Sequence, residues 1–210
     1  MTSHAVHFDS ERHQHESAEL GMWVFLATEL MFFGPLLLGY AVGREMYGPA
    51  FAAASRHTDV VIGTINTAVL LTSSLFMALA VLAVRSDRTR PAMRCLLVTA
   101  CLGVVFLVLK GFEYHSEWQE HLVPWSDFRF EPALRQGAGY FYFLYFAMTG
   151  LHAVHLSIGI VASVVFALRL RVNSARALAS QIEVTGLYWH FVDVIWVFLY
   201  PILYLVERHG

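Results

Sequence analysis

The sequence predicts an all-α integral membrane protein with five transmembrane helices. Of its 210 residues, 57% are hydrophobic and only 14% are charged, whereas a soluble domain carries about 25% charged residues. Five apolar segments are each long enough to cross the roughly 30 Å hydrocarbon core of a bilayer. Open strands are excluded there, because their unpaired backbone groups would face lipid. The formal net charge of −2 leaves no basic surface for a nucleic acid.

The apolar segments form a single expected transmembrane domain over residues 20–206, between a polar N-terminal tail, 1–19, and a short C-terminal tail, 207–210. The predicted helices are Leu20–Gly43, Val60–Val84, Met93–Tyr114, Ala138–Leu168 and Ile182–Val206. The connections are expected at Arg44–Asp59, Arg85–Ala92, His115–Gly137 and Arg169–Gln181. Eight arginines on the N-terminal side of the membrane against five on the other side predict a cytoplasmic N-terminus.

A carboxylate interrupts the first apolar segment. Glu29 lies about 13 Å along that helix from Leu20, at 1.5 Å per residue, and an ionisable side chain at such a depth is a functional candidate. It is either a carboxyl group that handles protons or senses lipid headgroups, or a neutral group that packs by hydrogen bonding. We expect its partner to be the carbonyl of Met31, which Pro35 leaves free, or a Ser or Thr of the second helix.

Further polar side chains lie inside the last two helices. Glu183, His190 and Asp193 follow at spacings of seven and three residues, so they share one stripe that must face protein. His152 and His155 are three residues apart on the fourth helix, and either could face His190 as the axial histidines of a haem do. The residues beside His190 are bulky, however, and the first two helices hold no histidine. A proton path stays open for the stripe. We expect a polar packing network and no metal or cofactor bound by this chain. The network residues are Asn66, His152, His155, Glu183, His190 and Asp193.

Five motifs, in chain order, resemble those of subunit III of haem–copper respiratory oxidases. They are Thr28–Phe33, Asn66–Ser74, Phe112–Tyr114, Gly150–His155 with Gly159, and Tyr188–Tyr200. The resemblance covers about residues 20–206, almost the whole predicted domain. It is specific because the motifs hold a buried Glu, paired His and a Trp-His-Phe-Val-Asp run in the family's order.

The resemblance implies a short, five-helix bacterial form of cytochrome c oxidase subunit III. It implies a V-shaped bundle, in which helices 1–2 and helices 3–5 enclose a phospholipid-filled cleft, with Trp23, Phe32 and Phe33 as candidates to line it. Glu29 would support proton uptake by the oxidase. The implied partners are the catalytic subunit I, which with subunit II holds the haem and copper, and membrane phospholipid. The implied location is the bacterial inner membrane, and the chain would not be catalytic on its own.

Two other functions stay open. An accessory subunit of a bacterial nitric oxide reductase is favoured by Thr72–Ser74 and Lys110–Tyr114, which are similar to that group. A more remote alternative is an independent proton-coupled transporter. Such transporters usually show paired repeats with broken helices, and we find neither. The electron donor, cytochrome c or quinol, is not fixed by the sequence.

Overall fold

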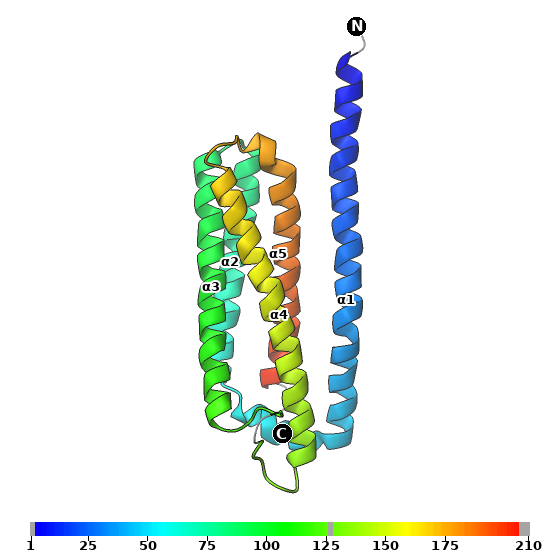
Figure 1. Ribbon diagram of the computed structural model, residues 1–210, viewed down its shortest axis with the longest axis vertical. Coiled ribbons are helices and arrows are strands. Elements are labelled where there is room, and N and C mark those ends of the chain that lie inside the picture. Colours follow the sequence, from blue (N-terminus) through cyan, green and yellow to red (C-terminus); the bar gives the residue numbers. More distant parts are fainter. Residues whose placement is uncertain (1–2, 126–127, 206–210) are drawn as a thin grey trace.

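The computed structural model describes the backbone of residues 3–125 and 128–205 and the side chains of residues 20–125 and 128–205. Over these residues every regular element is a helix (Figure 1). The long helices are α1 (Ser3–His57), α2 (Val60–Arg85), α3 (Thr89–Gln119), α4 (Arg135–Arg169) and α5 (Ala179–Tyr200). A 3₁₀ turn, η1 (Arg176–Leu178), precedes α5, and a π-helical turn, η2 (Pro201–Leu205), follows it. Five helices are long and apolar enough to cross a membrane, which confirms the predicted fold class.

Helices α2 to α5 pack into one bundle around Trp189. Its indole Nε1 donates to Ser73 Oγ on α2 over 3.1 Å, and its ring lies against α3 and α4 at two glycines. A Cβ at Gly159 would lie 2.9 Å from the Trp189 ring, and one at Gly103 would lie 3.0 Å from it. Hydrogen is therefore the side chain that these two positions admit without displacing the ring, and close approach of small residues is how membrane helices pack.

Helix α1 stands beside this bundle and packs along α4 and α5 (Figure 1). Helix α2 instead packs between α3 and α5. The predicted grouping of helices 1–2 against helices 3–5 is therefore wrong. The tight turn between α2 and α3 makes those two helices antiparallel neighbours, as short connections in bundles do, and α1 is left to pack on the opposite side.

The predicted first connection, Arg44–Asp59, is helical as far as His57. Helix α1 bends within it at Tyr47, where φ is −128° and ψ is 36°, two residues before Pro49, which cannot donate to the helix ladder. Beyond the bend, Phe51 and Ala54 are fully buried. The segment therefore carries α1 across the base of α4 to the start of α2 as part of the core. Helix α3 likewise runs on to Gln119, beyond the predicted end at Tyr114.

Candidate functional site

One face of α1 meets the bundle. It holds Met22, Leu26, Glu29, Phe33 and Tyr40, which are buried or half-buried and follow at spacings of four, three, four and seven residues. Those spacings keep side chains on one stripe of a helix. Glu29 is thus the one carboxyl group among these five, and it points toward the bundle.

The partner of Glu29 is His155 on α4. Glu29 Oε2 lies 3.3 Å from His155 Nε2, and both side chains are less than one-fifth exposed. On the other edge of the imidazole, His155 Nδ1 lies 3.2 Å from the Tyr188 hydroxyl, which itself donates to the His155 carbonyl over 2.9 Å. Three helices therefore meet at this one site.

These hydrogen bonds fix where the protons are. A tyrosine hydroxyl has one proton, and that of Tyr188 is used on the carbonyl, so His155 Nδ1 must be the donor to the Tyr188 oxygen. His155 Nε2 then faces Glu29 Oε2, and a hydrogen bond between these two atoms needs one proton. The pair is either a neutral carboxyl donating to imidazole or an ion pair, and the two states differ by moving that proton.

The predicted partners of Glu29 are wrong. The carbonyl of Met31 and the hydroxyls of the second helix were expected, whereas the structure supplies an imidazole from α4. The reason is the placement of α1, which contacts α4 and α5 instead of α2.

An apolar cavity of about 300 Å³ lies next to this site, between α1, α4 and α5. It is lined by Met22, Phe25, Ile158, Ala162, Val184, Thr185 and Tyr188. The predicted cleft residues lie elsewhere: Trp23 and Phe32 are 61% and 58% exposed on the outer side of α1, and Phe33 is buried, with its ring centroid 6.2 Å from that of His155. None of these three is among the residues that line the cavity.

The predicted stripe on α5 faces α2. Glu183 Oε1 accepts from Arg85 Nε over 2.7 Å, and His190 Nδ1 lies 2.7 Å from Ser74 Oγ. Asp193 is 4% exposed, and within the described part of the chain neither of its carboxylate oxygens has a hydrogen-bond partner. The stripe therefore consists of separate contacts rather than one continuous network.

His152 and Asn66 lie in the centre of the bundle. The His152 ring packs against Phe106 and Trp196, with centroids 5.5 and 5.1 Å away. Among the described atoms, His152 Nε2 and both amide atoms of Asn66 have no hydrogen-bond partner. Over the same residues, no three His, Cys, Asp or Glu side chains lie close enough to hold a metal ion.

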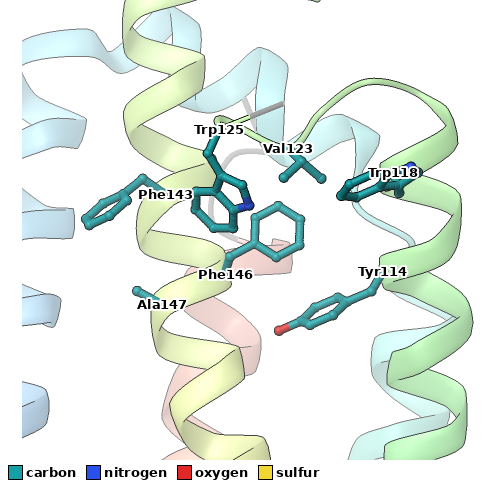
Figure 2. Close-up of a pocket in the computed structure, with 7 residues that line it drawn as sticks. All are labelled: Tyr114, Trp118, Val123, Trp125, Phe143, Phe146 and Ala147. Carbon is teal, nitrogen blue, oxygen red and sulfur yellow. The ribbon is translucent and has the colours of Figure 1, made fainter. Parts of the chain in front are cut away.

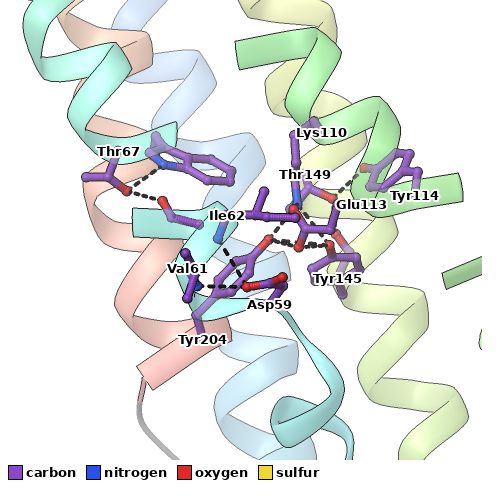
Figure 3. Close-up of polar contacts among 12 residues, drawn as sticks. Asp59, Val61, Ile62, Thr67, Lys110, Glu113, Tyr114, Tyr145, Thr149 and Tyr204 are labelled. Carbon is purple, nitrogen blue, oxygen red and sulfur yellow. Dashed lines mark hydrogen bonds and ion pairs between the residues drawn. The ribbon is translucent and has the colours of Figure 1, made fainter. Parts of the chain in front are cut away.

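The densest polar cluster surrounds Lys110 and Glu113. Lys110 is 4% exposed, and its Nζ donates to Glu113, Tyr145 and Tyr204 over 3.0, 2.8 and 2.6 Å. The two tyrosine hydroxyls also donate to Glu113 Oε1. Figure 3 shows these side chains converging from α3, α4 and η2. One ion pair thereby ties three distant segments together.

Glu117 lies one turn further along α3. It was placed in the third connection by sequence, yet it is helical and 5% exposed. Neither carboxylate oxygen has a hydrogen-bond partner among the described atoms. The sequence does carry a signal for the burial of Lys110 and Glu117. The residues Phe106, Lys110, Glu113 and Glu117 follow at spacings of four, three and four, which place them on one face of a helix.

A second apolar recess opens beside this cluster. The cavity, of about 350 Å³, is lined by Tyr114, Trp118, Val123, Trp125, Phe143, Phe146 and Ala147 (Figure 2). Tyr114 forms its inner wall and bonds Thr149 Oγ1 over 2.6 Å. The recess lies at the end of the bundle opposite the N-terminus, where aromatic side chains suit the membrane interface.

Comparison with known proteins places this architecture in a family. The family described as "Cytochrome c oxidase subunit III" matches residues 5–207. The chain is 33% identical to cytochrome c oxidase subunit 3 of Alkalihalophilus pseudofirmus, over 91% of this chain and 87% of that protein. It is 27% identical to a probable quinol oxidase subunit 3 of Staphylococcus epidermidis, over 98% and 97%. It is also 31% identical to a haem–copper oxidase subunit I+III of Aeropyrum pernix, over 88% of this chain but 22% of that fused protein.

Proposed function

Since the chain belongs to the cytochrome c oxidase subunit III family, we propose that it stabilises the catalytic subunit of an aerobic terminal oxidase, holds phospholipid and supports proton uptake. It is a multi-pass membrane protein and a subunit III of haem–copper oxidases, whose catalytic partner is subunit I and whose cofactors sit in other subunits. We place subunit II in the same complex and the complex in the bacterial inner membrane. The observation that carries the proposal is the Glu29–His155 pair beside the apolar cavity.

The proton role is supported by the geometry of the pair. Glu29 and His155 hold one proton between them, and Tyr188 fixes the imidazole so that only Nε2 faces the carboxylate. A carboxyl group and an imidazole in hydrogen-bond contact can pass one proton from one to the other. The chain therefore offers the oxidase a proton-holding group at membrane depth.

The lipid role is supported by the cavity. Its walls are almost wholly apolar, and three helices form them without closing the space. An acyl chain from the surrounding bilayer fits such a lining. Its methylene groups would pack against apolar side chains, and no polar group would lose a hydrogen-bond partner. Phospholipid in this cavity would also fill the seam that joins α1 to α4 and α5.

A Glu29→Gln variant tests the proton role. Glutamine keeps the shape and can still bond His155, so the variant subunit is expected to stay in the purified complex, while the initial rate of oxygen reduction or the active lifetime declines. Glu45→Gln is the matched control, since Glu45 is exposed on the same helix. Subunit content, initial rate and decay of rate are measured. Full activity with normal durability in Glu29→Gln would overturn the proton role.

An Ala162→Phe variant tests the lipid role. Phenylalanine at this lining position fills the cavity, so the complex is expected to retain less phospholipid after delipidation in detergent. Val161→Phe is the control, because Val161 is the adjacent residue of α4 and is 62% exposed. Phospholipid is counted per complex by mass spectrometry. Equal retention in both variants and in the unmodified complex would contradict lipid binding in this cavity.

The alternatives differ in what the complex consumes. Two of the relatives named above are a cytochrome c oxidase subunit 3 and a probable quinol oxidase subunit 3, and family membership gives an independent transporter no support. The Lys110–Tyr114 stretch, which favoured a nitric oxide reductase, has a structural role in the buried cluster around Lys110. We therefore propose an oxygen-reducing parent. Consumption of nitric oxide instead of oxygen by the purified complex would reverse that choice.

A further inference from the structure

One end of the bundle carries an excess of arginine. Where α2 ends and α3 begins, and where α4 ends and α5 begins, the chain holds seven arginines and two carboxylates, Asp87 and Glu183. We call this the arginine end; its members are Arg85, Arg88, Arg90, Arg94, Arg169, Arg171 and Arg176, all exposed. Figure 1 shows both connections together at the end of the bundle to which the N-terminus also points.

The two connections form one surface. The Ala175 amide donates to Thr89 Oγ1 and the Arg176 amide donates to Asp87 Oδ1, each over 3.2 Å. Glu183 forms an ion pair with Arg85, with 2.7 Å between Oε1 and Nε. Both carboxylates are thus engaged within the fold, and over the described residues none of the other six arginines has a carboxylate partner.

The surface lies at the level of lipid headgroups. Helix α2 has 26 residues, which span about 39 Å at 1.5 Å per residue, against a hydrocarbon core of roughly 30 Å. Its last residue, Arg85, and the last residue of α4, Arg169, therefore emerge at the polar boundary of the bilayer. Val172, beside Arg171, is 85% exposed, so the connection presents an apolar tip among its charges.

We infer that the arginine end binds the phosphate groups of anionic phospholipids. Guanidinium groups bond phosphate oxygens in pairs, and basic residues next to membrane helices attract anionic lipid. The depth of the surface and its exposed Val172 favour a bilayer over an acidic protein as the occupant. This site is distinct from the cavity beside Glu29, because none of its arginines lines that cavity.

The test uses the purified oxidase complex in nanodiscs that contain phosphatidylglycerol and phosphatidylcholine. Native mass spectrometry gives the ratio of the two lipids that stay bound. The triple variant Arg88→Gln, Arg169→Gln, Arg171→Gln is expected to lower this ratio, by up to roughly fivefold for each arginine at low salt. Arg171→Gln alone is compared with Arg135→Gln, an exposed arginine at the opposite end, which should leave the ratio unchanged.

High salt should reduce the difference between the unmodified complex and the triple variant, because it screens exposed charges. Haem absorbance and content of this subunit show that the variants are assembled. An unchanged lipid ratio in the triple variant overturns the inference. Loss of another subunit with an unchanged ratio also overturns it, and it would assign the arginine end to an acidic protein surface.

Discussion

Removing one charge of the buried Lys110–Glu113 pair is expected to destabilise the protein far more than removing both. The two side chains are 4% and 3% exposed, and they share Tyr145 and Tyr204 as hydrogen-bond partners. Loss of one partner of a buried pair costs about 3–5 kcal/mol, whereas replacing both charges by apolar groups is often neutral. The comparison therefore separates an uncompensated charge from lost packing.

The two single variants differ in what remains. In Lys110→Met, the Glu113 carboxylate still accepts hydrogen bonds from Tyr145 and Tyr204. The loss of stability should therefore lie near the lower end of the range of about 3–5 kcal/mol. In Glu113→Leu, the ammonium loses its bonded carboxylate and keeps tyrosine oxygens and the ring of Tyr145, 4.7 Å from Nζ. At about 2–4 °C per kcal/mol for chains of this size, the losses correspond to roughly 6–20 °C in melting temperature.

Thermal melting of the purified complex, followed by tryptophan fluorescence and by content of this subunit, measures the effect. Trp196 is a suitable reporter, because its ring lies 5.5 Å from Lys110 Nζ. Arg135→Met is the control, since Arg135 is exposed and an exposed charge contributes at most about 1 kcal/mol. If Lys110→Met with Glu113→Leu lowers the melting temperature by the sum of the single losses, the charges are not coupled and the reasoning fails.

Two further predictions concern packing. Gly159→Ala should lower the free energy of unfolding by about 1–3 kcal/mol, because the added methyl group overpacks against Trp189. Gly150→Ala on the same helix should leave the melting temperature nearly unchanged, since its new Cβ would meet only the tip of one side chain at 3.9 Å. Equal effects of the two variants would contradict the close contact at Gly159. Phe33→Ala should lower the free energy of unfolding by about 3–5 kcal/mol, because it opens a cavity where α1 meets α4. Phe32→Ala on the exposed face should be nearly neutral. Retention of the subunit in the purified complex distinguishes the two variants.

The number and type of helices could be predicted from the sequence because each span is a long apolar run, and length alone decides that a helix must cross the bilayer. The helices that pack against α1 could not be predicted in this way. Its exposed face is as apolar as its buried face, so Trp23 and Phe32 look the same in sequence as the buried Phe33. Hydrophobic contrast marks the inner face of a soluble helix, but a membrane helix lacks it.

The polar residues show the same limit in another form. The stripe of Glu183, His190 and Asp193 was correctly expected to face protein, because three ionisable groups cannot all face lipid. The depth of Lys110 was not foreseen, since its burial depends on Tyr145 and Tyr204 from segments far along the chain. A lysine near the end of an apolar run reaches the surface unless the fold brings it other partners.

Helix α4 joins the Glu29–His155 pair to the buried cluster around Lys110. Tyr145, Thr149, His152 and His155 follow at spacings of four, three and three residues on its inner face, and the helix packs against α1, α3 and α5. Tyr145 bonds Lys110, and His155 meets Glu29. Because α1 reaches the bundle through a single seam, the position of His155 is set by α4 and its anchors on α3. Helix α4 therefore connects the buried cluster around Lys110 to the imidazole that faces Glu29.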